Sequence, residues 1–251
     1  MDNLDLLIDL HIDGARQGPG SAAATRRAME MAGLTGRSGL RIADIGCGTG
    51  ASSLQLAREL DAQVTAVDFL PAFLDRLRAA RDAAGLGERI AVETASMEDL
   101  PFEAGRFDAI WSEGAIYNMG FENGIRAWKR FLKPGGVLAV SELSWLTGSR
   151  PADLQAHWEE AYAEVATASV KIAQLEAAGY APIGYFPLPE EAWRDEYYGP
   201  LQTRFEAFLA RHGQSAQAQA LIASEREEIA LYERHAQYYG YGFYLARALA
   251  G

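Results

Sequence analysis

The chain has 251 residues, of which 49% are hydrophobic and 23% charged, as expected for a globular protein. Its net charge of −11 argues against a nucleic-acid partner, because phosphate binding needs clustered lysine and arginine. The acidic first residues, the lack of an apolar run near the roughly 20 residues that span a bilayer, and the single cysteine, Cys47, predict a cytoplasmic protein without a secretory signal or membrane insertion.

The first 35 residues predict two helices and a loop between them. The first helix has apolar residues at helical spacing, namely Leu4, Leu7, Ile8 and Ile12. A Gly-Pro-Gly loop at 18–20 leads to a second helix over 22–32, which Ser21 is suited to cap. We expect the first helix and the loop to fold over the functional site as a lid.

From residue 40 onward, short apolar runs alternate with helical patterns. The apolar runs predict five strands, at 41–45, 64–67, 90–94, 107–112 and 137–142. Helical patterns over 51–60 and from Pro71 onward follow the first two strands. This βαβαβ order predicts an α/β fold of the Rossmann-like, doubly wound kind, with a mostly parallel sheet and helices on both faces.

The pattern changes after residue 146. Helical patterns cover 151–179 and 200–239, and two further strands are predicted at 181–188 and 240–247. We therefore predict a seven-stranded sheet with an antiparallel last strand. The chain is predicted to be one domain over 1–251, with N-terminal helices over 1–35, a cofactor-binding core over 40–146 and a helical insertion over 189–239.

The segment Asp-Ile-Gly-Cys-Gly-Thr-Gly, from Asp44 to Gly50, joins the first predicted strand to a helix. Glycine tolerates positive φ and lacks the Cβ that would keep a ligand from the backbone, so the loop suits an anion or a cofactor. The second predicted strand ends in Asp68, which is placed to accept hydrogen bonds from both hydroxyls of a ribose. The alternative is an ordinary tight turn between strand and helix.

Two kinds of cofactor loop fit this segment. Residues 46–51 match the Gly-x-Gly-x-x-Gly/Ala pattern of dinucleotide-binding enzymes. An acid followed by Gly-x-Gly-x-Gly is the pattern of the S-adenosylmethionine (SAM) loop, in which the acid helps to hold the ligand's ammonium. Asp44 has no role in the dinucleotide pattern, so it favours the SAM loop.

Several polar or sulfur-bearing residues are predicted to lie at the carboxyl ends of the strands, where ligands bind in parallel sheets. These residues are Asp44, Asp68, Ser96, Met97 and Glu113. Their convergence at one edge of the sheet predicts a single site.

Five segments together resemble class I SAM-dependent methyltransferases, over about residues 22–146. The segments lie at 44–50, 64–68, 97–102, 107–111 and 131–138. The combination looks most like the small-molecule group typified by ubiquinone- and menaquinone-biosynthesis enzymes. Residues 17–21 and 111–118 also resemble those of an uncharacterised bacterial subgroup, which supplies no substrate.

The resemblance implies a role for each matching residue. Gly46, Gly48 and Gly50 would line the cofactor. Asp68 would bind the ribose and Phe69 would lie against the adenine. Ser96 and Met97 stand where the family contacts the adenine edge, often with an aspartate in place of Ser96, and Glu113 would lie near the methionine end of the ligand.

Methyl transfer from a sulfonium mainly needs an aligned acceptor and a dry site, so no obligatory catalytic triad is expected. Glu113 and Tyr117 are candidates for orienting the acceptor. The alternatives are a solvated loop acid for Glu113 and a packing role for Tyr117. The four histidines are scattered without a metal-binding pair, so no metal is predicted.

We therefore expect an enzyme that transfers the methyl group of SAM to a small molecule. The partner is a small-molecule acceptor, with no nucleic acid, and the sequence leaves a homodimer open. Two other functions remain open: a nicotinamide-dependent (NAD(P)) oxidoreductase, and a regulatory protein that binds SAM without turnover.

Overall fold

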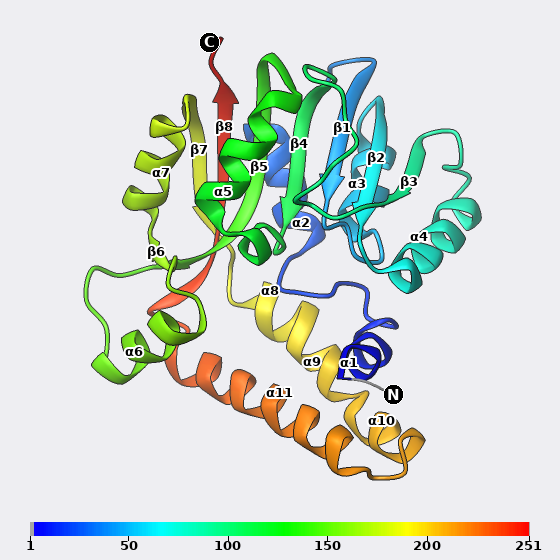
Figure 1. The fold of residues 1–251 in the computed structure, drawn as a ribbon, viewed down its shortest axis with the longest axis vertical. Coiled ribbons are helices and arrows are strands. Elements are labelled where there is room, and N and C mark those ends of the chain that lie inside the picture. Colours follow the sequence, from blue (N-terminus) through cyan, green and yellow to red (C-terminus); the bar gives the residue numbers. More distant parts are fainter. Residues whose placement is uncertain (1–2, 251) are drawn as a thin grey trace.

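The computed structural model describes residues 3–250, and its centre is one twisted β-sheet (Figure 1). Residues 1, 2 and 251, which the predicted lid and domain include, lie outside the described part. The strands are β1 Leu40–Ile45, β2 Ala62–Asp68, β3 Ile90–Thr94, β4 Phe107–Glu113, β5 Leu132–Trp145, β6 Ala166–Thr167, β7 Tyr180–Pro187 and β8 Tyr239–Ala248. Seven of them follow the order β3-β2-β1-β4-β5-β8-β7, and the short β6 pairs with the end of β5.

The direction of the strands agrees with the predicted fold. β1 to β5 pair in parallel, whereas β8 is antiparallel to both of its neighbours, β5 and β7. The predicted α/β fold, with a seven-stranded, mostly parallel sheet and an antiparallel last strand, is therefore confirmed. β6 is an addition that no pattern predicted, because two residues are too few to show alternation.

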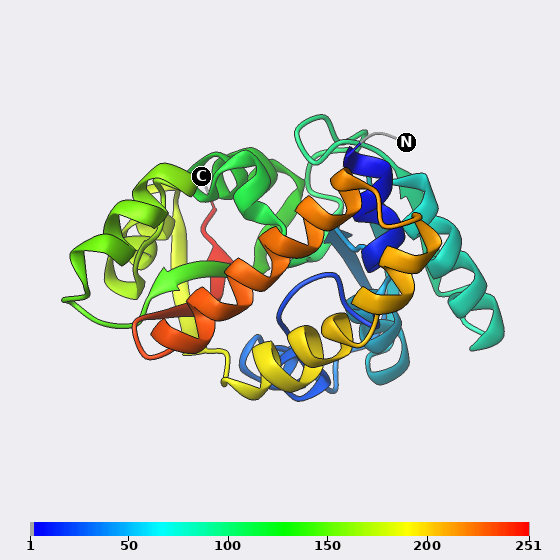
Figure 2. The same ribbon diagram turned by 90° about the horizontal axis from the view of Figure 1, so that it is seen from below.

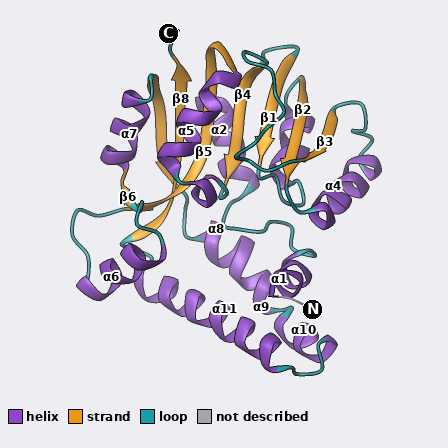
Figure 3. Cartoon of the chain, in the orientation of Figure 1, coloured by secondary structure: helices purple, strands orange, loops and turns teal. Residues whose placement is uncertain are grey.

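Helices cover both faces of the sheet (Figure 3). The helices are α1 Asn3–His11, α2 Ala22–Met31, α3 Ala51–Glu59, α4 Pro71–Ala83, α5 Phe121–Trp128, α6 Ala152–Ala161, α7 Ala168–Ala177, α8 Glu191–Trp193, α9 Gly199–Gln202, α10 Phe205–Arg211 and α11 Ala216–His235. Side chains alternate between two buried clusters along β1, with Ile42 in the cluster of α2 and α3 and Ile45 in that of α5 and α7. Both faces of β1 are thus buried, which explains its continuous apolar sequence.

Two local details differ from the sequence expectation. β5 begins at Leu132 rather than at residue 137, because Leu132 pairs with Phe107 before a register shift in β4. α5 was not predicted, although Phe121, Ile125 and Trp128 lie at i, i+4 and i+7 and are all buried. Ser21 does cap α2 as expected, since its hydroxyl accepts from the Ala24 N–H at 3.1 Å.

The segment between β7 and β8 forms a second layer of helices beyond the carboxyl ends of the strands (Figure 1). The predicted helical region 200–239 divides into α9, α10 and α11, with a break around Gly213 as expected. Helix α1 packs against α10 and α11, and α11 crosses beneath the sheet (Figure 2). Asp9 of α1 binds Arg211 at 2.7 Å and His212 at 2.8 Å. We call α1 and α8–α11, residues Asn3–His11 and Glu191–His235, the cap.

No helix in the stretch from residue 3 to residue 250 combines the length and apolar character needed to cross a bilayer.

Candidate cofactor-binding site

A cavity of about 240 Å³ opens at the carboxyl edge of the sheet, beneath α1 and the loop that follows it. Seven of the predicted site residues line it: Gly46, Gly48, Asp68, Phe69, Met97, Glu113 and Tyr117. Three others, Asp44, Gly50 and Ser96, lie outside the wall. The carboxyl ends of β1, β2 and β4 therefore meet at one site.

The glycine loop follows β1, and each of its glycines has a different neighbour. Gly46 and Gly48 have φ of 72° and 54°, a conformation that side chains disfavour. A Cβ on Gly46 would collide with Ala115, and one on Gly48 would lie 2.5 Å from the side-chain oxygen of Gln17. Gly50, at φ 92°, faces Leu77 of α4 instead of the cavity. Its lack of a Cβ lets the Leu77 side chain approach the glycine loop.

The N–H groups of this loop are all used within the protein. Those of Gly46 and Cys47 donate to the Val67 carbonyl, and that of Gly50 donates to the Cys47 carbonyl. The Gly48 N–H donates to Asp68 and the Thr49 N–H to the Gln17 side chain, both at 2.9 Å. No N–H from residue 46 to residue 50 is therefore free to bind an anion.

Asp68 ends β2, and its carboxylate is fixed by two backbone donors. One oxygen accepts from the Gly48 N–H at 2.9 Å and the other from the Leu70 N–H at 3.0 Å. The residue is 8% exposed, and burial raises the pKa of its carboxyl. Because a carboxylate oxygen has two lone pairs, each oxygen keeps one acceptor position. This arrangement suits a pair of vicinal hydroxyls.

Aromatic and sulfur-bearing groups line the same side of the cavity. Phe69 directly follows Asp68 and is 56% exposed, which is unusual for a phenyl ring. Met97 lines the cavity beyond β3. Ser96 instead turns its hydroxyl to the Glu98 N–H, at 3.2 Å, so the adenine contact proposed for it has no support from the cavity wall.

Asp44 lies behind the wall in a fully buried position. Its Oδ2 accepts from the hydroxyls of Ser52 at 2.7 Å and Ser53 at 2.5 Å. Its Oδ1 has no hydrogen-bond partner within the described residues. Burial raises the pKa of this carboxyl to about 6, against the opposing effect of the two serines. An unpaired, buried carboxylate oxygen is costly, so it is poised to receive a donor from a ligand.

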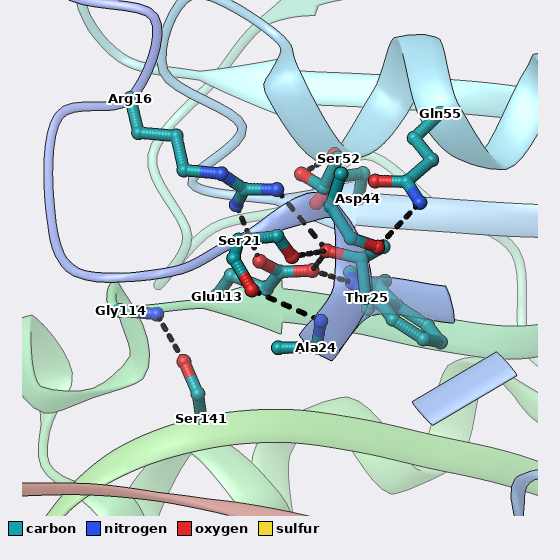
Figure 4. A network of polar contacts seen from close by, with 12 residues as sticks. Arg16, Ser21, Ala24, Thr25, Asp44, Ser52, Gln55, Glu113, Gly114 and Ser141 are labelled. Carbon is teal, nitrogen blue, oxygen red and sulfur yellow. Dashed lines mark hydrogen bonds and ion pairs between the residues drawn. The ribbon is translucent and has the colours of Figure 1, made fainter. Parts of the chain in front are cut away.

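Glu113, at the end of β4, is held by three donors (Figure 4). Arg16 donates to one oxygen at 2.6 Å, while Thr25 at 2.7 Å and the Trp111 indole at 2.8 Å donate to the other. The Arg16 and Glu113 side chains are 12% and 8% exposed. With its carboxylate engaged in this way, Glu113 anchors the loop after α1. The oxygen that accepts from Arg16 keeps one acceptor position, so a role of Glu113 in orienting an acceptor stays a prediction.

Gln17 joins the loop after α1 to the glycine loop. Its side-chain oxygen accepts from the Thr49 N–H and hydroxyl, and its amide donates to the Gly14 carbonyl at 3.0 Å. The sequence had pointed to this loop as part of a lid, but had not assigned Arg16 or Gln17 a partner. The signal for such a partner in the sequence was the positive charge of Arg16, together with the acidic residues at the predicted strand ends.

Tyr117 lies on the short 3₁₀ helix Ile116–Met119 after β4. It is 41% exposed, lines the cavity, and its ring centroid is 6.1 Å from that of Tyr162. Its position at the border of the cavity and the cap keeps it a candidate for contact with an acceptor. Between residues 3 and 250, no cluster of three His, Cys, Asp or Glu side chains is arranged to hold a metal ion.

Comparison with known proteins identifies the domain. Residues 42–136 match a family described as "Methyltransferase domain". The ubiquinone/menaquinone biosynthesis C-methyltransferase UbiE of Geobacter sp. (strain M21) is 33% identical over 122 residues, which are 47% of this chain and 51% of that protein. The chain spans about half or less of the length of the curated relatives it matches.

Solved structures share the whole fold at low sequence identity. A SAM-dependent methyltransferase from Geobacter sulfurreducens, in complex with S-adenosylhomocysteine, is 16% identical with a TM-score of 0.84, over 96% of this chain and 97% of that one. The [4+2]-cyclase SpnF is 23% identical with a TM-score of 0.76, over 99% and 93%. Residues 42–136 thus match a methyltransferase domain, and the resemblance to class I SAM-dependent methyltransferases drawn from the motifs is confirmed.

The anchor between Arg16 and Glu113 gives a stability prediction. Arg16→Met leaves a nearly buried carboxylate without its cation, so we expect the free energy of unfolding in urea to fall by about 3 kcal/mol. Adding Glu113→Gln removes the unpaired charge and should restore most of that loss. The exposed pair Arg26–Glu59 is the control, where Arg26→Met should cost less than about 1 kcal/mol. Equal losses for the two arginines would contradict the assignment.

Proposed function

We propose that this protein transfers the methyl group of SAM to a small-molecule acceptor and releases S-adenosylhomocysteine. The observation that carries the proposal is the Asp68 carboxylate, fixed by the glycine loop and followed by the exposed Phe69 ring in one cavity. When bound, SAM supplies a methyl group already activated on a sulfonium. The chain's residues therefore need only bind, orient and exclude water.

Each part of the cofactor has a matching group in the site. Asp68 accepts hydrogen bonds from the two ribose hydroxyls, and the adenine lies against Phe69 beside Met97. The unpaired Oδ1 of Asp44 accepts from the ammonium of the methionine end, directly or through a water. Gly46 lines the cavity beside this end of the ligand, and its lack of a Cβ lets Ala115 pack against the glycine loop.

The geometry of the glycine loop disfavours a nicotinamide cofactor. Dinucleotide enzymes bind the pyrophosphate with backbone N–H groups of this loop and the following helix. Here the five N–H groups from residue 46 to residue 50 already donate to protein oxygens. The buried, unpaired Asp44 would also repel a pyrophosphate. Both features suit a ligand with an ammonium group.

The fold by itself does not select a reaction, since the fold of SpnF, a cyclase, is the same. The choice of methyl transfer over a regulatory role rests on the family match at residues 42–136. We further propose that the chain works as one unit, with residues 1–35 as lid, 40–146 as cofactor-binding core and 189–239 as acceptor-side insertion. A cytoplasmic location and a homodimer stay predictions.

The ribose assignment predicts the effect of changing Asp68. S-adenosylhomocysteine should bind the wild type with micromolar affinity, and Asp68→Asn should lose about 1–3 kcal/mol because hydrogen bonds to a charged acceptor are lost. Isothermal titration calorimetry measures this, with circular dichroism to check folding. Asp75→Asn, a largely exposed carboxylate on α4, is the control and should bind as the wild type does. Unchanged binding by Asp68→Asn would refute the ribose assignment.

The Asp44 assignment predicts a pH dependence of cofactor binding. The ligand's ammonium needs the ionised carboxylate, whose pKa is about 6 in the free protein. Affinity for S-adenosylhomocysteine should therefore be constant above about pH 7 and fall up to about tenfold per pH unit below pH 6. Calorimetry between pH 5 and pH 8 tests this. Asp44→Asn should bind weakly with a flat profile, and a flat profile in the wild type would exclude Asp44 from this role.

The raised pKa of Asp44 affects the stability of the fold in the opposite direction to cofactor binding. Because the folded pKa of Asp44 lies above the ordinary value of 3.8, the unfolded chain ionises first as the pH rises. Asp44 thus stabilises the fold below about pH 4 and loses that contribution by about pH 6. A bound ammonium would compensate for this loss, which links cofactor binding to stability.

A further inference from the structure

The cap brings a set of tyrosine rings to the end of the cavity where Tyr117 lies. Tyr241 of β8 contacts Gly114 of the cavity wall, where a Cβ would be 3.0 Å from its ring. Trp193 lies beside Tyr241, with ring centroids 4.9 Å apart. Tyr197 and Tyr198 follow in the same segment, with their centroids 5.2 Å apart. An aromatic wall thus continues from the cavity into the cap.

Glu228 of α11 places a carboxylate beside these aromatic residues. The Tyr198 hydroxyl donates to its Oε1 at 2.9 Å. Burial raises the pKa values of further tyrosines nearby, and the negative charge of Glu228 adds to this effect for Tyr117, Tyr197, Tyr239 and Tyr241. These four rings come from the 3₁₀ helix Ile116–Met119, the cap and β8, so the charge of Glu228 acts where the cap meets the sheet. Figure 2 shows α11 crossing beneath the sheet.

Glu228 combines accessibility with partial desolvation. Its side chain is exposed, yet its surroundings desolvate the carboxyl enough to raise its pKa. A side chain on an open convex surface would not be desolvated in this way. Solvent therefore reaches Glu228, while the protein around its carboxyl desolvates it in part.

Glu228 also differs from two other glutamates, Glu142 and Glu225, in that it has no ion-pair partner. Glu142 binds Lys171 at 3.0 Å, and Glu225 binds His11 at 3.3 Å. Glu228 makes no ion pair with any residue from 3 to 250, and its one hydrogen bond comes from a neutral hydroxyl. Arg204, whose charge acts on Tyr197, donates to the Leu10 carbonyl instead. A partly desolvated carboxylate without a cation is unfavourable, and a cationic ligand would relieve it.

A second observation also points to a ligand. The Tyr239 hydroxyl is buried, with the residue 1% exposed, and has no hydrogen-bond partner within the described residues. A buried hydroxyl is usually paired. The region around Glu228 thus offers an unpaired carboxylate oxygen, an unpaired hydroxyl and several aromatic faces.

We propose that the acceptor is an organic amine that binds beneath the cap as a cation, between the Glu228 carboxylate and the rings of Tyr197 and Tyr241. For transfer, the bound ammonium gives a proton to the Glu228 carboxylate, and the freed nitrogen lone pair forms a bond to the methyl carbon of SAM. The bond between that carbon and the sulfonium sulfur breaks, and its electron pair stays on the sulfur of S-adenosylhomocysteine. Aromatic faces attract ammonium groups through their quadrupole, and a carboxylate supplies the neutralising charge. Such a site favours an amine over a phenol or a carboxylic acid of the same size. The role as acceptor site rests on the proposed methyl transfer, whereas cation binding does not.

The test compares two probes of the same shape and different charge. Choline carries a quaternary ammonium, and 3,3-dimethylbutan-1-ol is its neutral carbon analogue. With S-adenosylhomocysteine present, calorimetry should show choline binding about tenfold tighter than the alcohol. Glu228→Gln should weaken choline about tenfold without changing the alcohol. Glu227→Gln, at the exposed neighbour on α11, is the matched control and should bind choline as the wild type does.

A ring variant tests the aromatic part of the site. Tyr197→Leu should weaken choline several-fold, and Tyr197→Phe should restore it because the ring face remains. Circular dichroism melting of each variant separates loss of binding from loss of fold. Equal affinity for choline and the alcohol, or equal effects of Glu228→Gln and Glu227→Gln, would overturn the proposal.

Separate titrations distinguish this inference from the proposed function. If S-adenosylhomocysteine binds but choline is not preferred, methyl transfer stands and the amine acceptor is refuted. If choline binds in a Glu228-dependent way but S-adenosylhomocysteine does not bind, the cation site is supported and its role in methyl transfer is refuted.

Discussion

The two backbone hydrogen bonds to the Asp68 carboxylate are the constraint on which the rest of the site depends. The Gly48 N–H ties the carboxylate to the glycine loop, and the Leu70 N–H ties it to the start of α4. Together they fix the ends of β1 and β2 relative to each other. They also place the exposed Phe69 ring beside the carboxylate, so that a sugar and its base can be bound by adjacent residues.

The N-terminal segment completes this site by polar contacts that reach across the chain. Arg16 binds Glu113 at the end of β4 (Figure 4). Gln17 binds Thr49 in the glycine loop. Helix α1 in turn packs on α10 and α11. The loop after α1 is thus held by the sheet on one side and by the cap on the other. The proposed cofactor and acceptor sites therefore depend on the same contacts of the N-terminal segment, and movement of α1 would affect both.

Much of the sheet could be predicted from the sequence, because buried strands and their flanking glycines leave a local pattern. The positions of β1 to β4 and of Asp68 followed from such patterns. The partner of Glu113 did not, because Arg16 is 97 residues away and only the tertiary fold joins them. Gly50 shows the same limit: its neighbour Leu77 belongs to another helix, so the motif alone assigned it to the cofactor rather than to helix packing.

A crystal structure with S-adenosylhomocysteine tests the central claim most directly. The account predicts both ribose hydroxyls within hydrogen-bond distance of the Asp68 carboxylate, the adenine against Phe69, and the amino group on the side of Asp44. A nucleoside bound elsewhere on the molecule, or bound in this cavity with its ribose turned away from Asp68, would contradict it.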